Sequence, residues 1–168
     1  GDAVIVNGWG MSETHFGGLA EKARVKAEWL VPLPQAFTAA QAMVIGTAGY
    51  TAMLAVMALE DLGVSPAKGP VLVTGAAGGV GSALVQIGRL AGCEVVGVVG
   101  AAHKVEHCRR MGAAQVIDKS RVDLWAEAER FAPAGYHAIF DANGVATLRQ
   151  SYDHLAATGR LMIYGFHS

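Results

Sequence analysis

The stretch of sequence that decides the fold covers residues 71–81 and reads Val71-Leu72-Val73-Thr74-Gly75-Ala76-Ala77-Gly78-Gly79-Val80-Gly81. It joins a β-branched strand to a glycine-rich turn and then to a helix with apolar residues at helical spacing. Gly78 and Gly79 let a pyrophosphate approach the backbone, and the helix offers N–H groups from about Gly79 onward. Gly81 is expected to let the helix pack closely on the strand. The stretch predicts a dinucleotide site that includes Ala77 and Val80, and the alternative is a tight turn that binds nothing.

Outward from this stretch, strands and helices alternate regularly toward the end of the chain. Further strands are expected over residues 94–99, 115–118, 137–141 and 161–164. Helices are expected over residues 79–90, 103–111, 122–131 and 147–155. Strands that alternate with helices form parallel βαβ units with right-handed crossovers. The pattern therefore predicts an α/β fold with a doubly wound parallel Rossmann sheet of about five strands.

The first part of the chain follows a different pattern. Residues 4–6 and 19–25 are expected as short strands, and Pro32 and Pro34 are expected to stop regular structure. Helical patterns follow over residues 39–44 and 50–59, with Gly46 as an interruption. We expect residues 1–35 to form a small β segment and residues 36–168 to form the dinucleotide-binding domain.

Composition and charge argue against several classes of function. The formal net charge of -1 leaves no large basic field to hold nucleic acid or an anionic membrane. Cys93 and Cys108 have no CxxC spacing, which argues against a zinc site or a disulfide framework and favours reduced thiols in a cytoplasmic protein. The apolar run over residues 48–59 is too short to span a bilayer. Because the chain does not open with Met, we expect it to be a fragment.

The end of the second strand of the predicted sheet indicates which dinucleotide is bound. NAD-binding units place Asp or Glu there, about 20 residues past the glycines, to bind the ribose hydroxyls. Here the strand ends Val98-Val99-Gly100, with no acid between Glu94 and Glu106. A carboxylate at this point would repel a 2′-phosphate, so its absence favours NADPH, with Gly100 at the site.

Several cationic side chains follow the second and third strands and are candidates for binding that phosphate. Lys104 is preferred, with Lys119 as a further candidate, whereas for His103 and Arg121 a solvated surface charge is the simpler interpretation. Other histidines are expected on the surface, namely His107, His137 and His154. Methionines at helical spacing are expected in the core, namely Met43, Met53 and Met57.

Several motifs along nearly the whole chain resemble the zinc-independent medium-chain dehydrogenase/reductase superfamily, the group of quinone oxidoreductases and enoyl-thioester reductases. They are Gly17-Gly18-Leu19-Ala20-Glu21, Leu30-Val31-Pro32-Leu33-Pro34, Gly46-Thr47-Ala48-Gly49-Tyr50-Thr51-Ala52, Thr74 to Gly81, Gly112 to Asp118 and Gly159-Arg160-Leu161. The chain up to about Ser82 is similar to acryloyl-CoA reductases. The segments at 141–144 and 163–167 are more similar to generic quinone reductases or to vesicle-protein VAT-1-like members.

The resemblance implies roles for individual residues. Thr47 and Thr51 match positions near the nicotinamide, with helix packing as the alternative for Thr51. Lys104 matches a position that binds the 2′-phosphate, and Lys119 stands where related reductases often carry Tyr. The ends of the fourth and fifth strands face the ligand crevice in such sheets and add Asn143, Gly144, Gly165 and Phe166. No metal site is expected, and no residue is assigned to catalysis.

The function implied is hydride transfer from NADPH to the β-carbon of an α,β-unsaturated carbonyl compound, which is a quinone, an enone or an enoyl thioester such as acryloyl-CoA. Family members carry a GroES-like catalytic lobe, of which residues 1–35 would be an incomplete end. They also carry a sixth strand, through which relatives often form homodimers. The rest of the lobe and the sixth strand are expected to be lacking here. Because substrate-facing groups in the family come largely from the lobe, the chain alone is expected to be inactive. The alternatives are a non-catalytic, VAT-1-like binding module and an NAD-linked alcohol dehydrogenase.

Overall fold

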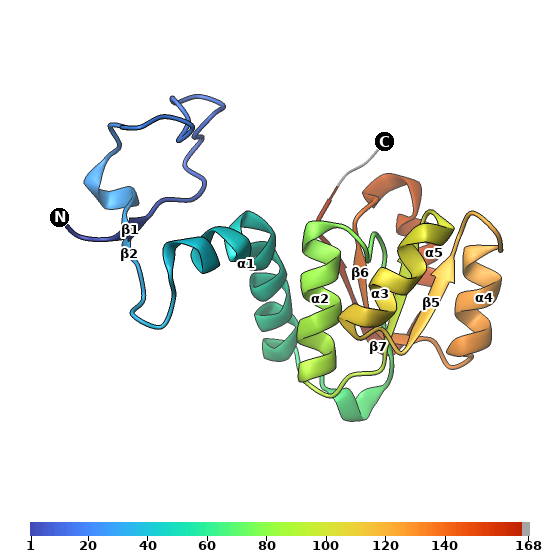
Figure 1. Ribbon diagram of the computed structural model, residues 1–168. Helices are drawn as coiled ribbons and strands as arrows, with labels where there is room; N and C mark the ends of the chain where they lie inside the picture. The colour runs from blue at the N-terminus through green and yellow to red at the C-terminus, as the bar shows by residue number, and fades with distance from the viewer. Residues whose placement is uncertain (166–168) are drawn as a thin grey trace. The chain divides into compact units, whose positions relative to one another are not determined.

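The computed structural model describes residues 1–165 and divides into two compact units, Gly1–Tyr50 and Thr51–Ser168 (Figure 1). The first unit contains a two-stranded antiparallel sheet, and the second contains a five-stranded parallel sheet. The boundary between the units falls within helix α1 (Ala39–Asp61).

The parallel sheet has the strand order β5-β4-β3-β6-β7. Its strands are β3 (Val71–Val73), β4 (Val95–Val99), β5 (Gln115–Asp118), β6 (Tyr136–Asp141) and β7 (Leu155–Ile163). This confirms the predicted doubly wound sheet. The chain first builds outward from β3 to β5 and then returns to the other side of β3, so the strand order reverses between β3 and β6. In such sheets a ligand binds in the crevice at the carboxyl ends of the strands at this point.

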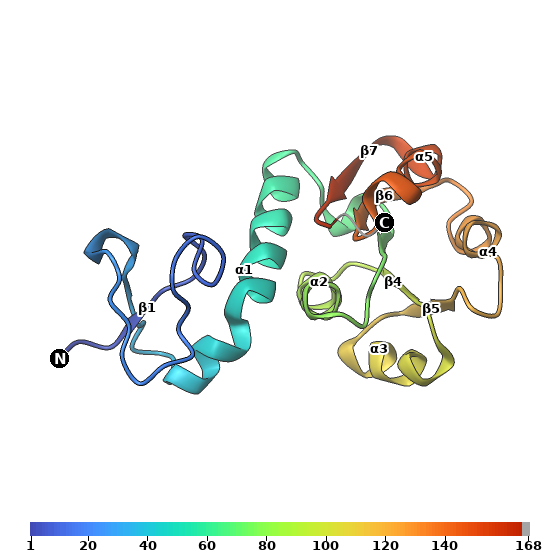
Figure 2. The same ribbon diagram turned by 90° about the horizontal axis from the view of Figure 1, so that it is seen from above.

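Alternate strand residues point to opposite faces of the sheet, and here the residues on both faces are apolar and buried. Helices therefore cover both faces. Helices α2 (Gly79–Leu90) and α3 (Val105–Met111) lie on one face, and α4 (Leu124–Phe131) and α5 (Leu148–Asp153) lie on the other (Figure 2). Val71 and Val73 pack in one hydrophobic cluster with Leu84 of α2. Leu72, between them in sequence, packs in a second cluster with Ala128 of α4.

The first unit is held together by one short sheet and an aromatic cluster. Strand β1 (Val4–Ile5) pairs antiparallel with β2 (Val31–Pro32), and the 3-10 helix η1 (Ala27–Trp29) precedes β2. The expected strand over residues 19–25 is wrong. Regular structure does stop at Pro32 as expected, although Pro32 is itself the last residue of β2. Proline is tolerated in β2 because β2 has a single partner strand, so its missing N–H costs no ladder hydrogen bond on the open side. Trp29 is buried beneath the stacked ring of Trp9.

Helix α1 is interrupted at Gly46, as predicted, where the backbone leaves helical geometry with φ 47° and ψ -156°. By length and composition the helix could cross a membrane, since an 18-residue window of it has a mean hydropathy of 1.8. After the kink, however, residues 47–61 extend only about 22 Å as a helix, which is shorter than the ~30 Å hydrocarbon layer. In the second unit, this part of α1 also packs in the core through Ala52, Ala55 and Leu59.

Two expectations about burial are wrong. Met43, Met53 and Met57 are 65%, 46% and 50% exposed, because the small residues of α1 occupy the buried positions instead. His137 is 5% exposed rather than on the surface, because β6 lies between β3 and β7 and is covered on both faces. The expected helix over residues 147–155 also ends earlier, at Asp153, where β7 begins two residues later.

The buried position of His137 leads to a prediction about pH. Burial lowers the pKa of this imidazole, and Lys68 and Arg160 lower it further. The unfolded chain therefore binds a proton near the ordinary value of 6.5, while the folded chain resists it, so stability is lost as the pH falls below that value. Urea unfolding between pH 7.5 and pH 5.5 should show a smaller loss of stability for His137→Gln than for wild type. His107→Gln is the control and should behave like wild type; an equal change for both variants contradicts the assignment to His137.

Thr158 leads to a second prediction, about backbone strain. It lies in the irregular part of β7 where the register with β6 shifts, and its φ is +65°. A β-branched residue in this left-handed region costs about 1–2 kcal/mol of conformational free energy, whereas Asn adopts it more readily. Thr158→Asn should raise the free energy of unfolding in urea by about 0.5–1 kcal/mol. Thr158→Val keeps the β-branch and should give no gain; equal stability of the two variants would show that Thr158 is unstrained.

Candidate functional site

A cleft of about 330 Å³ opens at the carboxyl ends of β3, β4 and β6, where the strand order reverses. All of its lining residues belong to the second unit. They are Gly75, Ala77, Gly78, Gly79, Val80, Gly81, Val98, Val99, Gly100, Lys104, Ala142, Asn143 and Tyr164. The cleft therefore forms where the fold predicts a ligand crevice, and it includes the whole glycine-rich turn except the buried Ala76.

The floor of the cleft is the turn between β3 and α2. Gly78 is the N-cap of α2 and has an extended backbone, and the backbone N–H of Ser82 donates to the Gly78 carbonyl at 2.8 Å. No side chain caps this helix. The N–H groups of the first turn thus have no partner within the helix and point toward the helix end. An anion at this end would accept hydrogen bonds from them and gain from the helix dipole.

Gly81 is fixed by a close backbone approach. A Cβ at this position would collide with the Gly75 carbonyl oxygen and lie 2.8 Å from the Ala76 Cα. The expectation that Gly81 permits close packing is therefore confirmed, although the close neighbour is the turn itself rather than the strand. Gly75 has φ +63°, a conformation that favours glycine, and completes the tight turn.

One end of the cleft is cationic. Gly100 follows β4, and Lys104 ends the 3-10 helix η3 (Ala102–Lys104) that leads into α3; both residues line the cleft. Lys119 is not a lining residue, but its Cε would lie 3.6 Å from a Cβ at Gly100, so its side chain stands beside this rim. No Asp or Glu stands between the end of β4 and Glu106. Asp118 at the end of β5 is engaged by the Ser120 hydroxyl at 2.6 Å and by Arg121, with 3.6 Å between the charged atoms.

Those contacts govern the ionisation of Asp118. The Ser120 hydroxyl lowers the pKa of the Asp118 carboxyl, and the Ser120 backbone N–H, Arg121 and His103 lower it further against the opposing effect of desolvation. Asp118 is thus a charged group held by its own loop.

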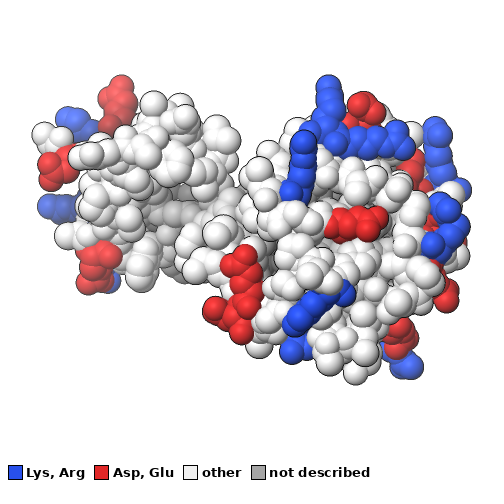
Figure 3. Space-filling model, turned by 90° about the horizontal axis from the view of Figure 1, so that it is seen from below, with Lys and Arg blue, Asp and Glu red and all other residues white. Residues whose placement is uncertain are grey.

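On the face drawn in Figure 3, basic and acidic side chains are interspersed.

The other end of the cleft is formed by the loops after β6 and β7. Asn143 lines it, and Gly144, which begins the 3-10 helix η4 (Gly144–Ala146), is buried directly behind. Tyr164 also lines the cleft, and its hydroxyl donates to the Thr74 carbonyl at 2.7 Å. Gly165 lies against this wall, because a Cβ there would be 2.6 Å from the Ala142 carbonyl oxygen.

The structure brings most of the predicted site residues together in the cleft, namely Ala77, Gly78, Gly79, Val80, Gly100, Lys104 and Asn143. Lys119, Gly144 and Gly165 lie next to lining residues without lining the cleft. Thr51 is not a lining residue, and Thr47 belongs to the first unit, where its hydroxyl donates to the Asn7 side chain at 2.8 Å. Phe166 lies outside the described residues.

Sequence reasoning missed Tyr164, Ala142, Val98 and Val99 as parts of the site. Val98 and Val99 are at the end of β4, so the rule that strand ends face the crevice identifies them. The same rule identifies Tyr164, which directly follows β7 and precedes the predicted Gly165. No sequence signal showed that Tyr164 would bond to the end of β3.

Two other features of the described residues bear on the site. Within residues 1–165, no group of three or more His, Cys, Asp or Glu side chains is arranged to hold a metal ion. The first unit has a wide hollow of about 910 Å³, bordered by residues 12–17, 24–26 and Trp29. It includes none of the residues predicted to bind the cofactor.

Comparison with known proteins gives the family of the chain. The zinc-binding dehydrogenase family model matches residues 79–168, just over half of the chain. The acrylyl-CoA reductase AcuI of Ruegeria pomeroyi is 50% identical over 123 residues, which cover 73% of this chain and 37% of the reductase. The chain therefore spans well under two thirds of that relative.

Solved structures agree with this result. YhdH of Escherichia coli K-12 with bound NADPH is 41% identical, with a TM-score of 0.87 over 99% of this chain and 50% of that one. The Bacillus subtilis protein yhfP with NAD bound is 35% identical, with a TM-score of 0.83 over 98% of this chain and 50% of that one. The chain belongs to the zinc-binding dehydrogenase family, within the medium-chain dehydrogenase/reductase superfamily that its motifs predicted.

Proposed function

We propose that this chain binds NADPH in the cleft and is the cofactor-binding part of a reductase. The observation that supports this most directly is the convergence of an uncapped helix N-terminus, a glycine turn without room for a Cβ, and a lysine on the rim. These groups match the three needs of NADPH, which are N–H donors for the pyrophosphate, close backbone approach and a cation for the 2′-phosphate.

The two ends of the cleft suggest where each part of the cofactor binds. The adenosine half lies over β3 and β4, with its 2′-phosphate at Lys104 and Lys119 and its ribose at Gly100. The pyrophosphate lies on residues 77–80 at the start of α2. The nicotinamide half then extends toward Asn143, Gly144 and Gly165, with Phe166, Thr47 and Thr51 as further proposed contacts.

The reaction we propose is reduction of an α,β-unsaturated carbonyl compound, with a quinone, an enone or an enoyl thioester such as acryloyl-CoA as substrate. Bound NADPH supplies the hydride. The residues described here bind the cofactor and orient its two halves. The acrylyl-CoA reductase relative supports an enoyl thioester substrate. We also propose that residues 1–35 belong to a GroES-like lobe, that the whole protein forms a homodimer and that it is cytoplasmic.

Zinc takes no part in this proposal. The family name refers to it, but the metal donors among residues 1–165 are not grouped to hold a zinc ion. Cys108 is buried in the core beside Gly97, and Cys93 is half-buried near Glu60. Burial raises the pKa of Cys108 to about 11, because the apolar core around this thiol disfavours a charged thiolate.

The proposal predicts a difference between NADPH and NADH. Replacing Lys104 by Ala should weaken NADPH binding about fivefold to thirtyfold, because one charge-assisted contact to the 2′-phosphate is worth on the order of 1–2 kcal/mol. NADH binding should stay the same, because NADH lacks that phosphate. The measurement is titration of the chain with each cofactor, followed by the fluorescence of the reduced nicotinamide.

Arg110→Ala is the matched control, because it removes an exposed cation of α3 that does not line the cleft. It should leave both affinities unchanged. Equal losses for NADPH and NADH in Lys104→Ala would contradict the assigned phosphate site. Tighter binding of NADH than NADPH by wild type would contradict the proposed cofactor and favour an NAD-linked dehydrogenase. NADPH binding without oxidation by any quinone or enoyl thioester in the whole protein would favour a non-catalytic module.

A further inference from the structure

The carboxyl group of Asp141 is fully buried behind the cleft and gathers hydrogen bonds from several directions. Its Oδ1 accepts from the backbone N–H groups of Asn143 at 2.7 Å and Gly144 at 3.3 Å. Its Oδ2 accepts from the hydroxyls of Thr147 and Ser151, each at 2.7 Å. Among the ion pairs of the described residues, none involves Asp141. A buried carboxyl is held by such donors because burial without them is costly.

Thr74 connects this carboxyl to the ends of two further strands. Its hydroxyl accepts from the Ala142 N–H at 2.8 Å and lies 3.4 Å from Asp141 Oδ1. Its carbonyl accepts from the Tyr164 hydroxyl at 2.7 Å. Burial raises the pKa of Tyr164 and the charge of Asp141 raises it further, so the phenol keeps its proton at neutral pH and remains a donor. The residues Asp141, Thr74 and Tyr164 thus form one network that joins the ends of β3, β6 and β7.

This network stands directly behind one half of the cleft. Gly75 and Ala142, which adjoin Thr74 and Asp141 in sequence, line the cleft together with Tyr164 itself. Asn143, whose backbone N–H donates to Asp141, lines it too. A Cβ at Gly75 would lie 3.6 Å from the Tyr164 hydroxyl oxygen, so the phenol borders the turn. In a doubly wound sheet the adenosine half of a dinucleotide lies over the first two strands, and the other half lies across the switch point. Here that second half is the β6 and β7 side.

We propose that the Asp141–Thr74–Tyr164 network is a positioning device for the nicotinamide half of the cofactor. This inference rests on the proposed binding of NADPH in the cleft. The network fixes the 142–144 loop and the Tyr164 ring against the glycine turn, so the wall that meets the nicotinamide is set before the cofactor binds. The adenosine half depends on Gly100 and Lys104 instead and does not need the network.

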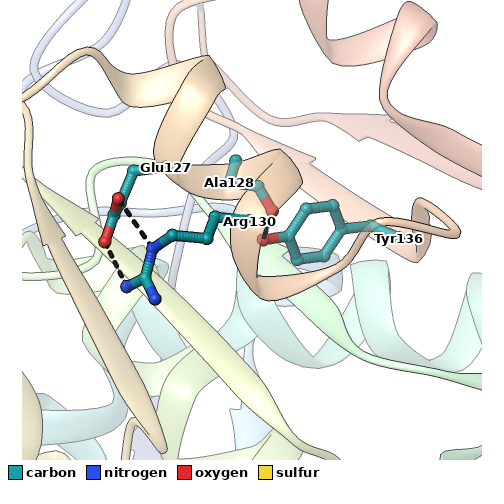
Figure 4. Close-up of polar contacts among 4 residues, drawn as sticks. All are labelled: Glu127, Ala128, Arg130 and Tyr136. Carbon is teal, nitrogen blue, oxygen red and sulfur yellow. Dashed lines mark hydrogen bonds and ion pairs between the residues drawn. The ribbon is translucent and has the colours of Figure 1, made fainter.

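The test compares two tyrosines that make the same kind of bond in different places. Tyr164→Phe removes the bond to the Thr74 carbonyl, and Tyr136→Phe removes the bond from the buried Tyr136 hydroxyl to the Ala128 carbonyl at 2.9 Å (Figure 4). Tyr136 lies at the start of β6, at the other end of the sheet, so its variant controls for a lost structural hydrogen bond.

Each variant is titrated with NADPH and with 2′-phospho-ADP-ribose, which lacks the nicotinamide. Tyr164→Phe should weaken the binding of NADPH about threefold to tenfold, because one neutral hydrogen bond that holds the wall is lost. It should also shift the fluorescence emission of bound NADPH. Its affinity for 2′-phospho-ADP-ribose should stay within about twofold of wild type. Tyr136→Phe should leave both affinities and the emission unchanged.

Equal losses for the two ligands in Tyr164→Phe, or no loss for either, would overturn the inference while leaving NADPH binding by wild type intact. Wild type that binds neither ligand would overturn the proposed function and this inference with it. Ser151→Ala removes a single donor to Asp141 Oδ2 and tests the far end of the network. It should weaken the binding of NADPH and leave the binding of 2′-phospho-ADP-ribose unchanged. A loss of stability with unchanged affinity for both ligands would show that Asp141 is structural only.

Discussion

The structure depends on one backbone constraint, the close approach of Gly81 to the carbonyl of Gly75. No side chain fits between them, because a Cβ on Gly81 would also lie 2.8 Å from the Ala76 Cα. The approach turns the chain sharply from β3 into α2 and leaves the first turn of the helix uncapped at the carboxyl edge of the sheet. Since β3 is the strand from which the sheet builds in both directions, the turn lies at the point where the strand order reverses. Fold and cleft therefore share one cause.

A second level of order is built on that turn. The ends of β3, β6 and β7 come within hydrogen-bond reach of one another. Polar groups at these buried strand ends, which would otherwise lack partners, are paired with one another there. Thr74 contacts both Asp141 and Tyr164, which are 67 and 90 residues away in sequence. The cleft thus has one rigid, internally bonded wall and one open, cationic rim at Lys104. This division matches a ligand with a flat ring at one end and a phosphate at the other.

The sequence predicted the parts of this structure that depend on local patterns. Strand and helix alternation predicted the parallel sheet, and the glycine spacing predicted the turn. It did not predict the role of Tyr164, because that role depends on which strands become neighbours across the sheet. It misplaced His137 because β6 is buried on both faces, so the alternation that usually separates inside from outside does not apply. It also misplaced the methionines of α1, where alanines fill the tight contacts with the sheet.

The measurement that tests the central claim most directly is backbone amide NMR during titration of the chain with NADPH. If the cofactor lies in the cleft, the largest shifts should belong to the amides of residues 77–81, Gly100, Lys104 and Asn143, and they should move together at one affinity. The amides that border the hollow of the first unit, residues 12–17 and 24–26, should not move with them. Shifts that gather in that hollow, with the glycine turn unchanged, would contradict the account.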